Sequence, residues 1–391
     1  MTSEKIYPLA STTWDDLEIE AMQRVIKSGK FTMGSEVSGY EKKFAEHFGA
    51  KYAVMSNSGS SANLLAVAAM RYSSRFSNPE KNEVIVPAVS WSTTYYPIVQ
   101  LGYKIKFVDI DLDSLNMSID QALSAIDEKT AGIFAVNLLG NPAELPALRK
   151  KCDELGIFLL EDNCESMGAS IEDKMAGSYG EVGTFSSFFS HHISTMEGGM
   201  CITDDLELAQ VMTSMRAHGW TRELPQENFV HNKTGDEFDD LFRFILPGYN
   251  LRPLELSGAI GIEQIKKLND FVSVRRDNAL YFQEAFKGIP NVRTQAENGL
   301  SSWFGFSMVL EGPISGRRAE LVKVLNDLGI DSRPIVAGNF TKNPVIKHLD
   351  HVEIGELPNA DKIHNDGLFV GNHHYDLEIP IKKLAEAVSE L

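Results

Sequence analysis

His191 is the residue of this chain best suited to moving protons. It lies in the run Ser190-His191-His192-Ile193, shortly before Glu197-Gly198-Gly199. An imidazole titrates near neutral pH and can act as a general acid or a general base. The sequence therefore predicts proton transfer at His191, provided that the fold carries this side chain to a binding site.

Paired histidines do not indicate a metal in this chain. His191-His192 and His373-His374 are adjacent in sequence, so the two side chains of each pair diverge on a strand or a helix. No Asp or Glu stands at a recognisable ligand spacing, and no His-Glu-x-x-His motif is present. We expect no metal site.

A turn of small residues is a candidate anion site. Ser58, Gly59 and Ser60 lie between an expected strand and an expected helix, where backbone N–H groups and the positive helix terminus meet. A plain strand-to-helix turn with a serine N-cap would explain the same residues. Asn250 and Arg252 could complete an anion site, or they could belong to a glycine turn with a solvated arginine.

Two carboxylates follow the strand expected at 156–160. Adjacent strand residues face opposite ways, so Glu161 and Asp162 cannot share a role. At the carboxyl end of a central parallel strand, Asp162 could point into a ligand crevice and pair with a protonated pyridine nitrogen. A solvated strand end is the competing interpretation. Trp91 could stack on a flat ring, although a lone tryptophan is more often part of the core.

Apolar runs alternate with helical patterns along the first two thirds of the chain. This alternation is typical of an α/β fold with a large, mostly parallel sheet covered by helices. The expected strands are at 52–55, 83–86, 104–109, 130–136 and 156–160, and the expected helices at 61–72, 118–126, 144–155 and 256–286. A strand at 303–310 and helices at 317–328 and from 379 onward follow.

These patterns predict that the chain is divided into an arm and two domains. The first is an N-terminal arm at 1–30, the second a large α/β domain at 31–264 that carries the candidate site, and the third a smaller C-terminal α+β domain at 265–391. The polar stretch from Asn228 to Asp240 is expected to be a surface loop.

Composition narrows the possible functions. The net charge is −17, which opposes binding to nucleic acid but not to a phosphorylated small molecule. No apolar run is long enough to span a bilayer and the start lacks a signal-peptide core, so we expect a cytoplasmic protein. Three cysteines are too few for an all-cysteine iron–sulfur cluster within one subunit.

Taken together and in this order, the motifs resemble the sugar aminotransferase family related to aspartate aminotransferase. These are the fold-type I enzymes that use pyridoxal phosphate (PLP). The resemblance covers nearly the whole chain. Each motif is modest, but five of them in register are highly specific. It rests on 29–34, on the small-residue turn, on Asp162, on Glu197-Gly198-Gly199 and on 248–252.

The resemblance implies a role for each matching residue. The cofactor phosphate would be bound by Gly59, Ser60 and Ser186, with Asn250 supplied by the partner chain of a homodimer. Trp91 would stack on the pyridine ring, Asp162 would pair with its nitrogen, and Glu165 would lie near the ring hydroxyl. His218, Arg252 and Arg333 are weaker candidates for contacts with the substrate.

His191 departs from the family pattern, because it stands where the relatives carry the lysine that binds PLP covalently. Within the family this replacement marks sugar 3-dehydratases. One kind acts on a CDP-sugar with an iron–sulfur cluster and a reductase partner. The other acts on GDP-4-keto-6-deoxy-D-mannose, on the route to colitose for cell-surface polysaccharide, and needs neither. With three cysteines, this chain resembles the second kind.

The implied reaction is removal of the C3 hydroxyl. Glutamate would convert PLP to pyridoxamine phosphate (PMP), His191 would move the proton, and ammonia and GDP-4-keto-3,6-dideoxy-D-mannose would be released. Two alternatives remain. The chain could be an ordinary PLP-dependent nucleotide-sugar aminotransferase with another base, or a non-catalytic protein of this fold that binds a nucleotide sugar.

Overall fold

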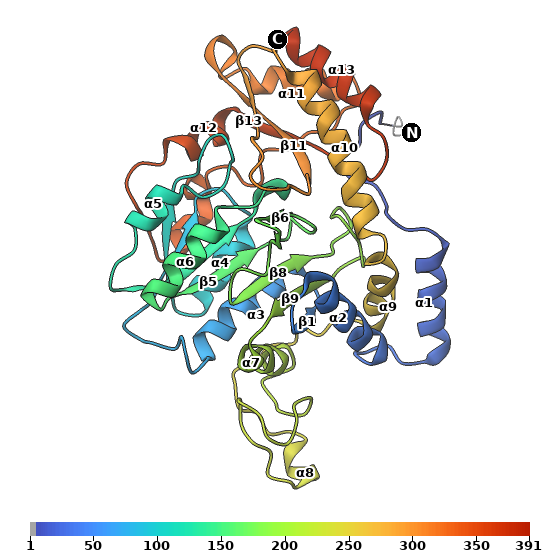
Figure 1. Ribbon diagram of the computed structural model, residues 1–391, viewed down its shortest axis with the longest axis vertical. Helices are drawn as coiled ribbons and strands as arrows, with labels where there is room; N and C mark the ends of the chain where they lie inside the picture. The colour runs from blue at the N-terminus through green and yellow to red at the C-terminus, as the bar shows by residue number, and fades with distance from the viewer. Residues whose placement is uncertain (1–4) are drawn as a thin grey trace.

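A computed structural model describes residues 5–391 of the protein (Figure 1). The first four residues of the arm expected at 1–30 lie outside the described residues. The rest of that segment contains helix α1 (Asp16–Ser28), which begins with a capping box formed by Asp15 and Glu18. No helix in the described range is both long and apolar enough to cross a membrane.

An eight-stranded sheet forms the centre of the molecule. Its strand order is β1-β9-β8-β5-β4-β2-β3-β12, and β9 alone runs antiparallel to its neighbours among these described strands. The strands are β1 (Tyr52–Ser56), β2 (Glu83–Pro87), β3 (Lys104–Val108), β4 (Thr130–Val136), β5 (Phe158–Asp162), β8 (Val182–Ser186), β9 (Gly199–Thr203) and β12 (His351–Glu353). The prediction of a large, mostly parallel sheet is therefore confirmed.

Helices cover both faces of this sheet. They are α2 (Ser35–Phe48), α3 (Gly59–Tyr72), α4 (Ser92–Gln100), α5 (Ile119–Ser124), α6 (Leu145–Leu155) and α7 (Leu206–Arg216). Helix α9 (Glu255–Gln264) packs against α1 and α2. The short helix α8 (Glu237–Asp240) lies in a segment that projects away from the sheet beyond α7, at the bottom of Figure 1. This segment contains the surface loop expected at 228–240.

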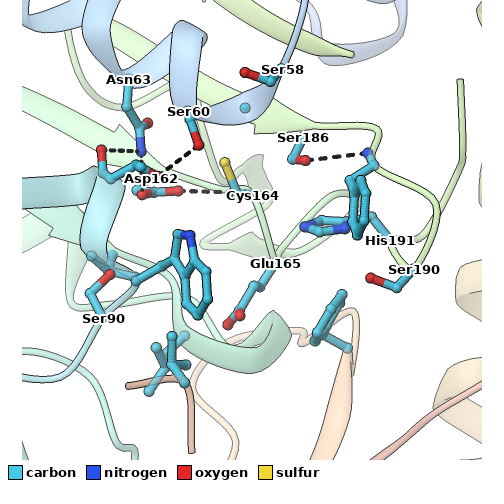
Figure 2. Close-up of a pocket in the computed structure, with 18 of the residues that line it drawn as sticks. Ser58, Ser60, Asn63, Ser90, Asp162, Cys164, Glu165, Ser186, Ser190 and His191 are labelled. Atoms are coloured by element: carbon cyan, nitrogen blue, oxygen red, sulfur yellow. Dashed lines mark hydrogen bonds between the residues drawn. The ribbon is translucent and has the colours of Figure 1, made fainter. Parts of the chain in front are cut away.

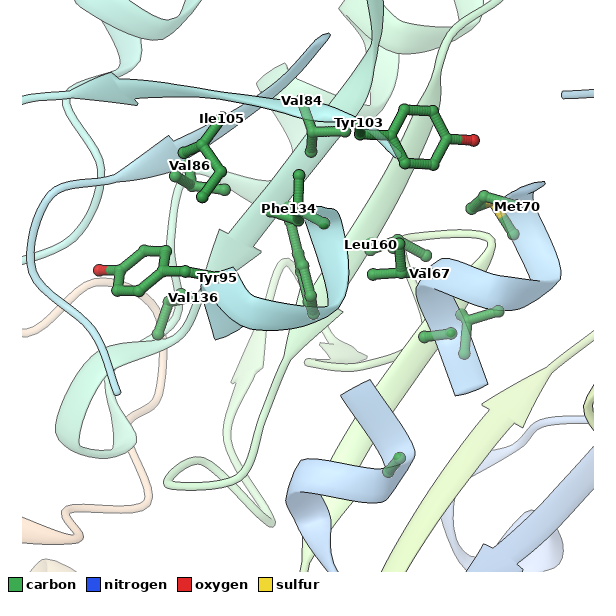
Figure 3. Packing of buried hydrophobic residues seen from close by; sticks show 14 of the residues in the cluster. Val67, Met70, Val84, Val86, Tyr95, Tyr103, Ile105, Phe134, Val136 and Leu160 are labelled. Carbon is green, nitrogen blue, oxygen red and sulfur yellow. The ribbon is translucent and has the colours of Figure 1, made fainter. Parts of the chain in front are cut away.

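Residue alternation explains how the strands are buried on both faces. Along β4, Phe134 and Val136 face one core cluster, whereas Ile133 and Ala135 face another. Figure 3 shows the first cluster, in which Val67 of α3 lies among side chains of the sheet. Full burial of side chains of this size stabilises the fold by about 1.5–3 kcal/mol each.

A second, three-stranded sheet lies beside the first, in the upper part of Figure 1. Its strands are β10 (Val292–Thr294), β11 (Gly305–Leu310) and β13 (Gly367–Gly371), and the nearby helices are α10 (Leu268–Phe286), α11 (Arg318–Asp327), α12 (Pro358–Asp366) and α13 (Glu378–Ser389). Phe282 of α10 stacks on Phe306 of β11 with ring centroids 4.5 Å apart. The remaining elements are the hairpin β6 (Ser170–Ile171) and β7 (Lys174–Met175) and 3-10 turns at Leu138–Gly140, Gly312–Ile314, Phe340–Lys342 and Pro344–His348.

The helix expected at 256–286 is two helices, α9 and α10, so the prediction of one continuous helix is wrong. Tertiary bonds hold both sides of the break. The buried Gln264 side chain bonds to Thr13 and to the backbone N–H of Ser194, and Lys267 pairs with the buried Glu18. The apolar spacing continues across the break and gives no sign of it. The boundary expected at 264 remains a prediction, although β12, from beyond it, completes the large sheet.

Candidate active site

A cavity of about 520 Å³ lies at the carboxyl ends of the parallel strands. Loops after β1, β2, β4, β5 and β8 form most of its wall, which is where open α/β sheets bind ligands. Phe304, Arg333 and Phe369, from around the three-stranded sheet, close another side, and Leu9 joins them from the N-terminal segment. The site is therefore built from segments distributed over the whole chain (Figure 2).

The turn at the start of α3 has the geometry of an anion cradle. Ser58 caps the helix by accepting a hydrogen bond from the Ser61 N–H, and Gly59 begins the first turn. A Cβ on Gly59 would lie 2.6 Å from the Ser186 Cβ, so only glycine lets these two chain segments approach. The first-turn amides of a helix have no helical partner and attract an anion.

Glu197-Gly198-Gly199 has a packing role beside this turn. A Cβ on Gly199 would lie 2.1 Å from the Ser58 carbonyl oxygen, and a Cβ on Gly198 would lie 2.3 Å from the Thr195 Oγ1. Gly199 therefore lets the loop that contains His191 lie against the cradle, and Gly198 lets the same loop pack closely on Thr195. This explains in physical terms why the motif follows the histidine so closely.

Asp162, the last residue of β5, is buried and faces the cavity. Its Oδ2 accepts hydrogen bonds from Asn63 and Thr94, each at 2.8 Å, and its Oδ1 accepts one from the Cys164 N–H at 3.1 Å. Three donors on a carboxylate that can accept about four leave one position on Oδ1 for a ligand. Glu161 points to the opposite face of the sheet, where it accepts bonds from Gly177, Tyr179 and Gly180.

His191 lies in the wall of the cavity, in the loop after β8. Its backbone N–H donates to the Phe188 carbonyl, and its ring packs against Phe304 with centroids 5.2 Å apart. Nδ1 is buried with no hydrogen-bond partner in the described chain. Burial, with a smaller contribution from the Arg275 charge, lowers the pKa of His191 to about 4. At neutral pH the imidazole is therefore uncharged and able to accept a proton.

His192 points away from its neighbour. Its ring is fully buried and its Nε2 lies 3.1 Å from the Ser302 carbonyl oxygen. The two histidines therefore diverge, as their adjacency predicts. Within residues 5–391, no three side chains of His, Cys, Asp or Glu form a group that could hold a metal ion.

Glu165 is a second ionisable group in the cavity. Its Oε2 accepts a hydrogen bond from the Leu139 N–H at 3.0 Å. Burial, assisted by the negative charge of Asp162, raises the pKa of Glu165 to about 7. The site therefore contains two groups with opposite pKa shifts, one a base at neutral pH and the other a carboxyl group that is half protonated. Such divergence is typical of catalytic sites.

Eight of the eleven residues predicted for the site line this cavity. They are Gly59, Ser60, Trp91, Asp162, Glu165, Ser186, His191 and Arg333. The other three do not line it in this chain. Asn250 is exposed and accepts a hydrogen bond from the Arg252 Nε, and the His218 ring packs against Trp220.

Sequence reasoning missed several residues of the wall. The sequence could have indicated Asn63, because this residue lies one helical turn after Gly59 and so on the same face of α3. Cys164 lies two residues after Asp162, the second of the strand-end carboxylates. No sequence pattern indicates Phe304 or Leu9, because only tertiary folding brings their segments to the site.

The fold and cavity together are those of an aminotransferase-like protein. The chain belongs to the DegT/DnrJ/EryC1/StrS aminotransferase family, which its residues 13–388 match. The resemblance inferred from the sequence motifs is therefore confirmed.

Relatives that share half or more of the residues of this chain are described more specifically. The chain is 55% identical over 380 residues to GDP-4-keto-6-deoxy-D-mannose 3-dehydratase of Yersinia pseudotuberculosis, covering 97% of each protein. It superposes on a solved structure of the Escherichia coli GDP-4-keto-6-deoxy-D-mannose-3-dehydratase with bound hydrated PLP, with a TM-score of 0.95 and 52% identity over 98% of this chain and 99% of that chain. A further structure of a GDP-4-keto-6-deoxymannose-3-dehydratase, with a trapped PLP–glutamate geminal diamine, has the same TM-score and identity and covers 98% and 100%.

Proposed function

We propose that this protein is a PLP- and PMP-dependent dehydratase that removes the C3 hydroxyl of GDP-4-keto-6-deoxy-D-mannose. One observation supports this particular reaction over the aminotransferase reaction of the family. Among the described residues that line the cavity there is no lysine, and His191 lies in the loop where the family pattern requires one. A cavity of this kind favours non-covalent cofactor binding and proton transfer over an ordinary aminotransferase cycle.

The cavity fits the cofactor in three respects. The first turn of α3, with Ser60 and Ser186 beside it, suits a phosphate group, and the free acceptor position of Asp162 Oδ1 suits a protonated ring nitrogen. Trp91, which is 59% exposed, offers an indole to cover a ring face. When bound, the cofactor supplies an amine that can condense with a ketone and a cationic ring that withdraws electrons.

His191 has two tasks in this proposal. Neutral at physiological pH, it takes a proton from a carbon atom held beside its ring, and it then delivers this proton to the C3 oxygen as that hydroxyl leaves as water. Positioned acid–base catalysis of this kind contributes about 10²–10⁴-fold to a rate. Glu165, protonated in part near neutral pH, can donate a hydrogen bond to an anionic oxygen in the same cavity.

The proposed reaction balances without an external reductant. The sugar loses one oxygen atom and gains two electrons, and glutamate is oxidised to 2-oxoglutarate with release of ammonia. Neither an iron–sulfur cluster nor a reductase partner is needed in this scheme. The glutamate adduct in the related solved structure supports glutamate as the amino donor.

We also infer a homodimer with shared sites. Asn250 and Arg252 lie outside the cavity of their own chain, and the family pattern expects Asn250 at the phosphate of the partner. Arg333, exposed at the cavity, is the proposed contact for an anionic part of the substrate, and His218 a weaker one. The net charge of −17 and three free cysteines support a cytoplasmic enzyme that binds neither nucleic acid nor membranes.

Incubation of the protein with PLP, glutamate and GDP-4-keto-6-deoxy-D-mannose tests the function. We expect one equivalent each of ammonia, 2-oxoglutarate and 3-deoxy ketosugar, measured by an ammonia assay and by mass spectrometry of the nucleotide sugar. Formation of an amino sugar without ammonia would instead establish an aminotransferase. Binding of the nucleotide sugar without turnover would establish a non-catalytic binder.

A further inference from the structure

Asp162 is held by a buried network of neutral donors. Asn63, Thr94 and Thr184 are each at most 1% exposed, and none of them carries a charge. Asn63 Nδ2 and Thr94 Oγ1 both donate to Asp162 Oδ2, each at 2.8 Å. Both bonds therefore occupy the same oxygen and leave the vacant acceptor position on Oδ1.

The orientation of the Asn63 amide is fixed by its partners. Nδ2 lies 2.8 Å from Asp162 Oδ2 and 3.2 Å from the Thr93 carbonyl oxygen, so it faces two acceptors. On the other side, Oδ1 accepts a hydrogen bond from Thr184 Oγ1 at 2.6 Å. A flipped amide would place oxygen against two oxygens, and it would leave the Thr184 hydroxyl facing an NH₂ group.

The direction of the Thr94 hydroxyl is fixed in the same way. Its single proton goes to Asp162, which as a carboxylate can only accept. The Ser90 hydroxyl, 2.8 Å from Thr94 Oγ1, must then be the donor in that pair. Each side chain that donates to Asp162 is thus oriented by a further hydroxyl group behind it.

We propose that Asn63 and Thr94 are positioning residues that keep the Asp162 carboxylate aimed at the ring nitrogen of the cofactor, with Thr184 orienting Asn63. The inference rests on the proposed function, because it requires the cofactor at Asp162. Hydrogen bonds to the charged form of a carboxyl group favour that form. The donors therefore keep the shared proton on the ring nitrogen, where it is needed for electron withdrawal.

Thr94→Val tests the proposal, because valine keeps the shape of threonine and removes the donor. With one donor lost, Asp162 competes better for the ring proton. The ¹⁵N NMR signal of PLP labelled at the ring nitrogen should move toward the unprotonated position, and kcat should fall about 10-fold with KM unchanged. Thr94→Ser, which keeps the hydroxyl, should restore both readouts.

Two more variants separate positioning from general damage. Thr184→Val acts through Asn63 and should shift the ¹⁵N signal in the same direction by less. Thr213→Val is the matched control, since the Thr213 hydroxyl bonds only to the Ala209 carbonyl within α7. It should change neither the signal nor kcat. If Thr94→Val does not fold, as judged by circular dichroism, the ¹⁵N signal and kcat of Thr184→Val test the proposal instead.

The outcomes distinguish the two proposals. A wild-type protein that does not bind PLP would overturn the proposed function, and this inference with it. A wild-type protein that binds PLP, with an unchanged ¹⁵N signal and unchanged kcat in folded Thr94→Val and Thr184→Val, would overturn this inference alone. A signal that moves equally in the Ser and Val variants at position 94 would also overturn it.

Discussion

The imidazole of His191 packs against the ring of Phe304, with centroids 5.2 Å apart. His191 lies in the loop after β8 of the large sheet, whereas Phe304 directly precedes β11 of the small sheet. Phe304 is itself held from two sides. Its N–H donates to the Leu139 carbonyl, and its carbonyl accepts a hydrogen bond from the buried Arg275. The proposed base therefore depends on a contact that spans both sheets.

Removal of the Phe304 ring should impair catalysis more than binding. In Phe304→Ala the His191 imidazole loses the nearer of its two aromatic neighbours, Phe304 and Phe188, and samples positions away from the reacting atoms, so we expect kcat to fall about 10- to 100-fold. Steady-state kinetics of ammonia release measures this. Phe238→Ala is the control, because Phe238 is 82% exposed on the projecting segment. Equal rates for the two variants would show that Phe304 does not position His191.

His191→Lys should restore covalent attachment of PLP. A lysine amine at this position can bond to the aldehyde of PLP, which an imidazole cannot do. After incubation with PLP and reduction with borohydride, the intact mass of the variant should increase by one reduced cofactor, while that of the wild-type protein should not. Ammonia release should fall at least about 100-fold, since the proposed base is lost. Undiminished release would remove His191 from the mechanism.

Local patterns predicted the parts of the fold that local forces determine. The continuous apolar run of β4 and the strand-to-helix turn at Gly59 can each be recognised in a short stretch of sequence, because burial on two faces and helix capping act over a few residues. The same logic predicted Asp162 at a strand end. The departure at His191 was visible because the motifs around it are in register.

Long-range packing determined the rest, and short patterns do not contain it. Nothing near Phe304 indicates that its segment reaches the cavity, and the break between α9 and α10 depends on buried polar bonds of Gln264 to Thr13, far away in the sequence. Asn250 and Arg252 illustrate a different limit. One chain does not bring them to its own cavity, so their predicted role depends on a partner chain.

Glu165 should contribute less to the stability of the cofactor-free protein as the pH rises. Burial raises the pKa of Glu165 from 4.5 to about 7, so between these pH values the folded protein holds a proton that the unfolded chain has released. The contribution of Glu165 to the free energy of unfolding should therefore decrease across this range, by up to about 3 kcal/mol. The stability of wild type relative to Glu165→Gln, which does not titrate, should therefore fall from pH 4.5 to pH 8. Urea unfolding at pH 4.5, 6 and 8 measures it, and parallel curves for both proteins would contradict it.

The contribution of His191 to the free energy of unfolding should change with pH in the opposite direction. Its pKa is lowered from 6.5 to about 4, so between these values the unfolded chain binds a proton that the folded protein does not. The free energy of unfolding contributed by His191 therefore increases as the pH rises from 4 to 6.5. His191→Asn, which does not titrate, should be more stable relative to wild type at pH 4.5 than at pH 7. The same urea series tests this, and an unchanged difference between the two pH values would refute it.

Gly140→Ala should disrupt the contact between the two sheets. Gly140 has φ 96°, and a Cβ there would lie 2.4 Å from the Trp303 backbone nitrogen, next to Phe304. Backbone strain and steric overlap combine, so we expect a loss of about 3 kcal/mol or more of unfolding free energy. Gly102→Ala is the matched control. Gly102 has φ 79° but no atom within 4 Å of an added Cβ, so only strain of about 1–2 kcal/mol should remain. Chemical denaturation of both variants measures the difference. Equal losses of unfolding free energy would show that the close packing of residues 138–141 against 301–304 does not contribute to stability.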